Sequence, residues 1–267
     1  MVEVQVFPEE VAVVRLQTLR SGLAGMAVHV YRAGPWLIDA GFAHARRQLL
    51  AWEGRRGARA CVLTHHHEDH VGNAAVLRSQ GLDVVAPSIV IDHLRLMEQR
   101  LPPYRRIIWG EARVGKVSPL SGSLSAGGWT LQPIHTPGHA PDHHVLYEPS
   151  RGLVFSADLY IAQRVPVARL EEDMATLIDS LRRVRELEPR VMYCAHRGRL
   201  TEPVKALDGK IAWIERVVDR ARELRRQGEE LAEITRRVLG RERLVRWVSG
   251  GELSKRNLIR VALRGDG

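Results

Sequence analysis

The segment that most constrains this chain is Thr64-His65-His66-His67-Glu68-Asp69-His70, which directly follows the apolar run 60–63. Imidazole nitrogens and carboxylate oxygens are the usual protein ligands of a borderline cation such as Zn²⁺. Ligands at spacings of two, two and one can converge only from a loop that folds back on itself. The end of a strand followed by the start of a helix provides such a loop, so we expect a metal-binding turn here.

Length and composition are those of an ordinary globular protein. The 267 residues are 45% hydrophobic and 27% charged, which predicts one large domain, or one domain with a small appendage. No basic N-terminal segment precedes an apolar run, and no run approaches the roughly 18 apolar residues of a membrane span. We therefore expect a cytoplasmic protein with no membrane partner. Cys61 and Cys194 lie in apolar runs and are expected to be reduced and buried.

Short β-branched runs alternate with glycine-bearing turns and helical stretches over the first 200 residues. Helices are expected at about 42–52, 70–80, 88–99 and 171–186. Strands come first in pairs and then alternate with helices, which predicts an α/β fold with two sheets enclosed by helices. The expected strands are Val11–Leu16, Ala27–Tyr31, Trp36–Ile38, Ala60–Leu63, Trp129–Ile134, His144–Tyr147, Leu153–Ser156 and Val191–Cys194.

The pattern changes beyond Pro203, so we divide the chain into a main domain, 1–204, and a C-terminal segment, 205–267. Apolar residues at helical spacing predict a helix over 211–227 that ends at Gly228. A second helix is expected at about 229–239, an extended piece at Leu244–Val248, and a last helix at about 252–263. This order predicts a small helical, or winged-helix-like, segment packed on the main domain.

Positive charge is concentrated in that segment. Residues 205–267 contain 16 Lys plus Arg and 10 Asp plus Glu, and the difference of +6 supplies most of the formal charge of +9. Clustered cations neutralise phosphates, which keeps a nucleic-acid partner open. A solvated helical surface with mixed charges is the favoured interpretation.

The His-x-His-x-Asp-His loop resembles the signature of the metallo-β-lactamase superfamily. The resemblance covers about residues 10–200 and implies a four-layer αββα sandwich with metals at one edge, where strand ends meet. It also implies three further ligands in a fixed order, and this sequence has a matching residue for each. His139 ends Thr136-Pro137-Gly138-His139, Asp158 follows the strand 153–156, and His196 follows the strand 191–194.

The resemblance assigns these residues to two metal positions. Asp158 would bridge both positions. The first position would use His65, His67 and His139, and the second would use Asp69, His70 and His196.

Two other residues are weaker candidates. Asp39 matches a family aspartate that supports the metal loop from behind, and such partners orient ligands and tune their basicity. Tyr160 lies two residues after Asp158 and could reach the substrate, although a packed aromatic ring is an equally good interpretation. His66 sits between two candidate ligands and is expected to point away from them.

The full ligand set predicts a hydrolase with two metal ions, most simply zinc, with iron or manganese as alternatives. A metal-bridging hydroxide, hydrogen-bonded to Asp69, would attack a carbonyl carbon. The expected substrate is a small ester, thioester or lactone. A nuclease or phosphodiesterase acting on RNA is the alternative, suggested by the basic C-terminal segment. Family members that are true zinc β-lactamases lack the bridging carboxylate, so β-lactam hydrolysis would be promiscuous at most. A binding protein without catalysis is disfavoured because no ligand is missing.

Overall fold

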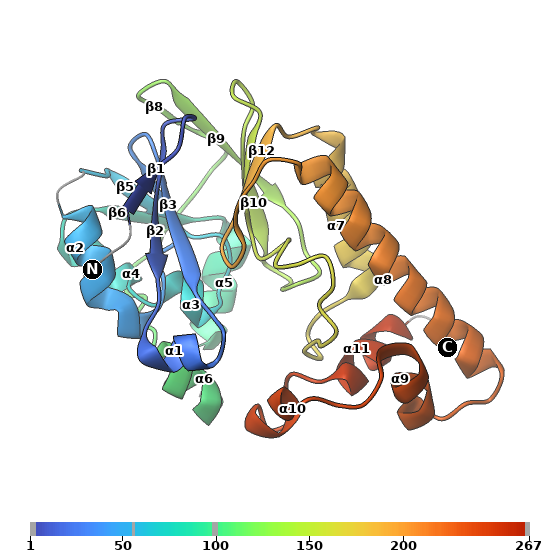
Figure 1. Ribbon diagram of the computed structural model, residues 1–267. Helices are drawn as coiled ribbons and strands as arrows, with labels where there is room; N and C mark the ends of the chain where they lie inside the picture. The colour runs from blue at the N-terminus through green and yellow to red at the C-terminus, as the bar shows by residue number, and fades with distance from the viewer. Residues whose placement is uncertain (1–3, 55–56, 98–100, 265–267) are drawn as a thin grey trace.

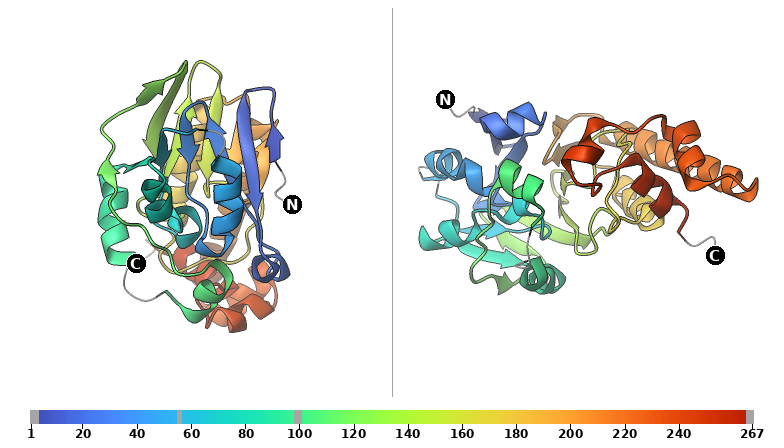
Figure 2. Two further views of the ribbon diagram at one scale, coloured as in Figure 1. Left: turned by 90° about the vertical axis from the view of Figure 1, so that its left-hand side faces the viewer. Right: turned by 90° about the horizontal axis from the view of Figure 1, so that it is seen from below.

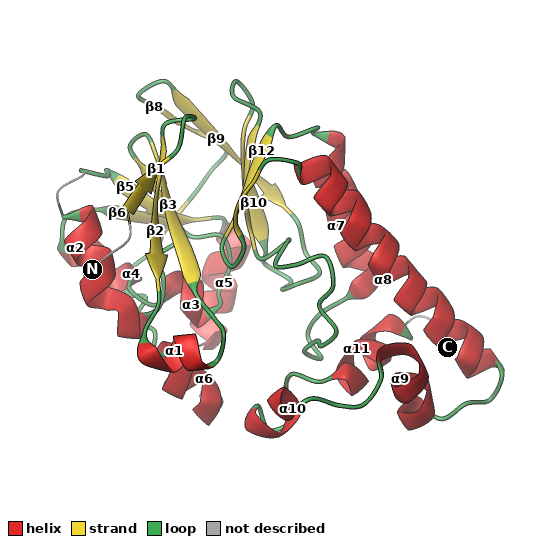
Figure 3. Cartoon of the chain, viewed as in Figure 1, coloured by secondary structure: helices red, strands yellow, loops and turns green. Residues whose placement is uncertain are grey.

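The computed structural model describes residues 4–54, 57–97 and 101–264. Two β-sheets face each other, and helices cover the outer side of each (Figures 1 and 3). The predicted four-layer αββα arrangement is therefore confirmed. No helix among the described residues is long and apolar enough to cross a membrane.

The N-terminal half forms a seven-stranded sheet whose strands follow chain order, β1 to β7. The β1–β4 pairs are antiparallel and the β4–β7 pairs are parallel. The strands are β1 (Val4–Val6), β2 (Val11–Leu16), β3 (Val28–Ala33), β4 (Trp36–Ile38), β5 (Ala60–Val62), β6 (Asp83–Ala86) and β7 (Ser118–Pro119). The helices of this half are α1 (Leu19–Leu23), η1 (Ala43–Ala45), α2 (Arg46–Glu53), α3 (Glu68–Val71), α4 (Ala74–Ser79), α5 (Ser88–Met97) and α6 (Pro103–Trp109).

The C-terminal half forms a six-stranded sheet in the order β13-β12-β11-β10-β9-β8, with one parallel pair, β11–β12. Its strands are β8 (Leu124–Ala126), β9 (Trp129–His135), β10 (His144–Glu148), β11 (Leu153–Ala157), β12 (Val191–Cys194) and β13 (Gly198–Leu200). Its helices are α7 (Met174–Glu186), α8 (Pro203–Arg226), α9 (Leu231–Leu239), α10 (Leu244–Val248) and α11 (Lys255–Ala262).

All eight predicted strands are present, with ends that differ by up to two residues. The single helix predicted over 70–80 is two short helices, α3 and α4, which are separated at Gly72 and Asn73. The helix predicted over 88–99 is α5, and residues 98 and 99 lie outside the described residues. The short strands β1, β6, β7, β8 and β13 were not predicted, because two to four residues carry too little periodicity.

Burial of alternating strand residues holds the two sheets together. Tyr31 from β3 packs against Phe155 from β11 and Tyr193 from β12, with ring centroids 5.9 and 5.2 Å away. A separate apolar cluster joins the first sheet to α2, α4 and α5, and another joins the second sheet to α7, α8, α9 and α11. The strand ends that carry the candidate ligands therefore rest on three packed cores.

Helix α8 begins at Pro203, and its apolar face shares one core with α7 and the second sheet. The remaining C-terminal helices lie beneath the second sheet, on the same side of the molecule as α1 and α6 (Figures 1 and 2). The division at 204 and 205 stays a prediction.

The extended piece predicted at Leu244–Val248 is wrong, because these residues form helix α10. A short apolar run does not distinguish a strand from a helix by periodicity alone. Leu244, Trp247 and Val248 are all exposed, so no sheet partner is present to stabilise an extended conformation.

Candidate metal centre

The ligand loop is anchored where strand β5 ends. The Thr64 backbone N–H donates to Asp39 Oδ1 at 2.9 Å, and its hydroxyl donates to Asp39 Oδ2 at 3.0 Å. Asp39 follows β4 with φ of 62°, in the left-handed region that aspartate tolerates better than most residues. These bonds hold two neighbouring parallel strand ends together, and helix α3 then turns the chain so that its side chains face back.

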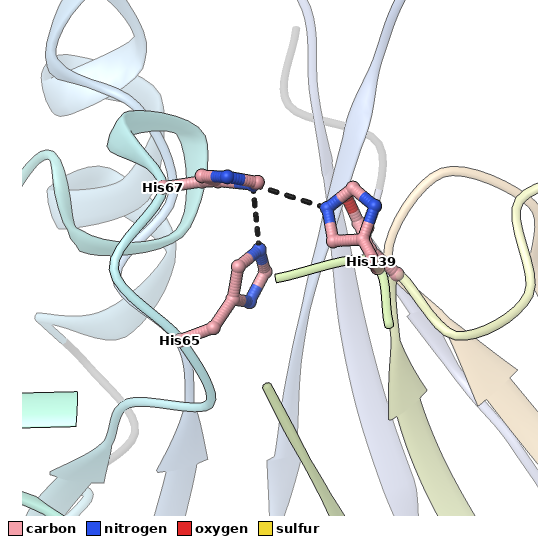
Figure 4. A group of neighbouring side chains, drawn as sticks. His65, His67 and His139 are labelled. Atoms are coloured by element: carbon pink, nitrogen blue, oxygen red, sulfur yellow. Dashed lines mark hydrogen bonds and ion pairs between the residues drawn. The ribbon is translucent and has the colours of Figure 1, made fainter. Parts of the chain in front are cut away.

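A first group of ligands meets around His67. Its Nδ1 lies 3.0 Å from His65 Nε2 and 3.0 Å from His139 Nε2, and Figure 4 shows the three rings converging. His139 Nε2 is also 3.3 Å from Asp158 Oδ2. The turn that aims His139 requires Gly138, whose φ is 128° and whose missing Cβ would lie 2.5 Å from the Leu177 backbone.

A second group meets around the carboxylates of Asp69 and Asp158. His196 Nε2 lies 3.2 Å from Asp69 Oδ2 and 3.3 Å from Asp158 Oδ1. His70 Nε2 lies 3.4 Å from the same Asp158 oxygen and 3.8 Å from Asp69 Oδ2. Asp158 thus belongs to both groups, one oxygen facing each.

A local irregularity of β11 directs Asp158 into this position. The register between β11 and β12 shifts between Phe155 and Ala157, and Ala157 has φ of 42°. Such backbone strain in a non-glycine residue tends to occur at functional sites. The Asp158 N–H donates to His143 Nε2 at 3.2 Å, so the buried His143 holds the turned backbone from behind.

The donor atoms fit metal ions. Ligands 2.0–2.1 Å from a tetrahedral zinc ion lie roughly 3.3 Å from one another, and the separations above are close to this value. The four donors of each group lie within 4.8 Å of one another. His70 Nε2 and Asp158 Oδ1 are buried without a hydrogen-bond partner. Burial of such atoms costs free energy of folding unless they bind a cation. All seven predicted ligands are therefore brought together, and their role as ligands stays a prediction.

The electrostatics of the two groups differ. Burial lowers the pKa of His65, His67 and His139 well below the usual value, so these imidazoles are neutral, as metal ligands must be. Burial opposes ionisation of Asp69, but His70 and His196 lower its pKa to about 2. Burial opposes protonation of His70 and His196, but Asp158 and its neighbouring carboxylates raise the pKa of His70 and raise that of His196 to about 10. These two imidazoles therefore carry the balancing positive charge without metal, and a bound cation would displace their protons and take over that charge.

Hydrogen bonds on the far ring nitrogens leave the Nε2 atoms free to bind a cation. His70 Nδ1 donates to Asp39 Oδ2 at 2.7 Å, and His196 Nδ1 donates to the Ala27 carbonyl at 2.9 Å. His65 Nδ1 lies 3.0 Å from Thr64 Oγ1. Metal-binding histidines are commonly oriented in this way. Asp39 therefore lies behind the ligand loop, at the position that the sequence comparison with the family predicted.

We expect Asp39→Asn to weaken metal binding about 10- to 100-fold, because an amide nitrogen cannot accept the His70 Nδ1 proton. Asparagine also tolerates the left-handed backbone at this position, so the fold is retained. Competition with a chromophoric chelator measures the affinity, with the exposed Asp83→Asn as a matched control. Metal affinity within twofold of the unsubstituted protein would contradict the role of Asp39.

Arg169 is a site residue that the sequence did not indicate. One of its terminal guanidinium nitrogens lies 3.1 Å from His67 Nε2, and its Nε lies 3.3 Å from Glu252 Oε1. Arg105 donates to both Glu252 and the buried Glu68, which sits inside the ligand loop. Ion pairs thus join the ligand loop to the segment between α10 and α11. No motif marks these residues, because their partners are distant along the chain.

His66 and Tyr160 belong to neither of the two ligand groups described above. The His66 ring contacts Asp142 Oδ1 at 2.8 Å, and its backbone N–H donates to Asp142 Oδ2, so His66 braces the loop through a residue that the sequence did not connect to it. Tyr160 is buried in the apolar core beside α8, and the Lys210 ammonium lies 5.6 Å from its ring centroid. The packed-aromatic interpretation of Tyr160 therefore fits its position better than a substrate contact.

Comparison with known families gives one domain match. A family model described as the metallo-beta-lactamase superfamily matches residues 31–196, which span every candidate ligand. A beta-lactamase-like protein 2 homolog from Caenorhabditis elegans is 27% identical over 176 residues, covering 65% of this chain and 53% of that protein. A hydroxyacylglutathione hydrolase from Aeromonas hydrophila is 30% identical over 144 residues, covering 53% and 49%. The chain thus spans about half the length of these curated relatives.

Solved structures share the fold over nearly the whole chain. A metallo-beta-lactamase family protein from Thermus thermophilus superposes with a TM-score of 0.70 at 19% identity, covering 98% of this chain and 95% of its own. A beta-lactamase domain protein from Burkholderia ambifaria gives a TM-score of 0.72 at 16% identity, covering 97% and 86%. The shared fold therefore extends through the C-terminal helices.

Proposed function

Because this chain belongs to the metallo-β-lactamase superfamily, we propose that it is a hydrolase with two divalent metal ions, most simply zinc, acting on a small ester, thioester or lactone. The observation that carries this proposal is the position of Asp158, whose two oxygens face two separate ligand groups. Relatives named as hydroxyacylglutathione hydrolases support an acyl substrate.

Divalent cations held by these residues would supply Lewis acidity, which lowers the pKa of a water molecule and polarises a substrate carbonyl. Asp69 is ionised at neutral pH and lies at the edge of the cavity, so its carboxylate orients the attacking water and accepts its proton. Asp158 keeps the two ligand groups at a fixed separation. This chemistry needs no serine or cysteine nucleophile, and both thiols are buried in strands away from the cavity.

A nuclease acting on RNA is the second candidate, supported by the +6 charge of residues 205–267. Several of these arginines pair with glutamates on the same surface, as Arg220 does with Glu223 and Arg236 with Glu233. Such pairing reduces the positive field available to a phosphate backbone. We therefore rank the small-molecule hydrolase first.

A rate panel on the zinc-loaded protein tests the choice. We expect chelator-sensitive cleavage of aryl esters, thioesters or lactones, and rates near background for a bis-aryl phosphodiester and short single-stranded RNA. The same panel in the presence of chelator is the control for metal dependence. Preferential cleavage of the phosphodiester or RNA would replace this proposal with the nuclease.

A further inference from the structure

The candidate ligands open onto a cavity of about 310 Å³ that is walled mainly by apolar side chains. Its volume is at the lower end of the roughly 300–1,000 Å³ usual for small-molecule sites. The walls come from the loop between β11 and α7, from α7 itself, and from the C-terminal helices. The apolar residues important here are Val165, Val167, Leu177, Ile214, Leu253 and Leu258.

Besides the candidate ligands, three charged residues line the cavity, and each has a partner within the protein. Lys210 Nζ donates to the Leu159 carbonyl at 2.9 Å, and Glu172 accepts from the Arg169 N–H at 2.8 Å. The Arg169 guanidinium is held against His67 and Glu252. Away from the candidate ligands, a molecule in this cavity therefore meets mainly apolar side chains.

The buried charges of Lys210 and Glu172 have weakly polar surroundings. Burial lowers the pKa of Lys210 to about 8 and raises the pKa of Glu172 to about 7. Both shifts disfavour the charged form, which is the effect of weakly polar surroundings. A hydrocarbon group would gain more from this environment than a polar one.

Part of the wall is fixed by the ion pairs described above. Glu252 is held by Arg105 and Arg169, which places the next residue, Leu253, at the cavity. Ile214 and Leu258 are 1% and 2% exposed and belong to the core of α7, α8 and α11. The cavity is therefore preformed by packed helices and does not depend on a flexible loop alone.

We propose that this cavity is an acyl-chain pocket, so that the preferred substrates are esters or thioesters of unbranched, medium-length fatty acids. The proposal rests on the hydrolase function above and names its substrate class. The carbonyl carbon lies at the ligand groups, and the chain extends between α7, α8 and α11. Water adds to the carbonyl, and the bond to the alcohol or thiol breaks. The acid is released, and the leaving group takes the proton accepted by Asp69.

Binding of unreactive amides tests the pocket apart from hydrolysis. We expect affinity to rise about fourfold per methylene from butanamide to octanamide, until the chain fills the cavity. Isothermal titration calorimetry measures the affinities, and the change in tryptophan fluorescence, to which Trp109 and Trp213 at the cavity contribute, reports occupancy. Affinity that is independent of chain length would overturn the pocket.

Variants that fill the cavity provide a second test of the acyl-chain pocket. Val167→Trp should remove the chain-length dependence of amide binding and lower the ratio of octanoyl to acetyl ester kcat/KM by at least tenfold. Val248→Trp is the matched control, because Val248 is 59% exposed on α10. Leu253→Trp is the second filling variant if Val167→Trp does not fold. Unchanged chain-length dependence in a folded filling variant would contradict the proposal.

The two proposals fail in different ways. Length-dependent amide binding with no cleavage of any ester would remove the hydrolase function and leave the pocket in place. Ester cleavage without a chain-length preference, together with length-independent amide binding, would remove the pocket and leave the hydrolase.

Discussion

Asp158→Ala is expected to lower metal content at both positions and to reduce hydrolysis to background. One carboxylate serves both ligand groups, with Oδ2 3.3 Å from His139 Nε2 and Oδ1 3.3 Å from His196 Nε2. Its loss leaves each group with fewer donors and one less negative charge, and both changes weaken binding of a divalent cation. Metal analysis of the purified variant by inductively coupled plasma mass spectrometry measures the outcome.

The exposed Asp179 provides a matched control, since Asp179→Ala removes a carboxylate from the surface of α7. That variant should retain the metal content of the unsubstituted protein. Two full equivalents of metal in folded Asp158→Ala would show that Asp158 does not bridge the two groups.

Asp69→Ala is expected to lower kcat/KM by about 10²- to 10⁴-fold, because the variant lacks the carboxylate that accepts the proton of the attacking water. Burial would raise the pKa of Asp69, but His70 and His196 lower it to about 2, so the side chain is a carboxylate throughout the neutral range. Asp69 lies in the first turn of α3 and belongs to none of the apolar clusters, so circular dichroism should show a retained fold. Initial rates on the best ester of the panel measure the effect.

Asp69→Asn separates the two roles of this residue. The amide oxygen can still approach a cation, but the side chain cannot accept the proton as a carboxylate does. We expect metal content nearer to that of the unsubstituted protein and a rate as low as that of the alanine variant. A fully active Asp69→Ala protein would refute the mechanism.

The candidate site was predictable because its chemistry is local in the sequence. Four of the seven donors lie within six residues of one loop, and Gly138 marks the turn before His139. The resemblance to the family predicted the order of the remaining ligands along the chain. The structure brings two of them, Asp158 and His196, together with the donors of the loop. The strands were predictable for the same reason, since buried runs such as Val191–Cys194 contain no charged residue.

The ion pairs that join the ligand loop to Glu252 were not predictable, because their members are far apart in the sequence. Glu68 and Arg105 are 37 residues apart, and Arg105 and Glu252 are 147 apart. Neither separation follows a helical or strand period, so no pattern connects them. Helix α10 was missed because five residues are too few to show a period. The apolar cavity was missed because its walls come from segments of both halves of the chain that meet only when the chain is folded.

The seven donors are divided between the two halves of the sandwich. Asp69 and His70 follow a strand of the first sheet, whereas Asp158 and His196 follow strands of the second. A cation held by all four would join the sheets, and an unfolded chain offers no such arrangement. Metal uptake and closure of the sandwich would then be one thermodynamic event, in which free zinc raises the melting temperature by mass action. The lifetime of the chain against proteases would accordingly follow the supply of metal as well as the quality of its cores.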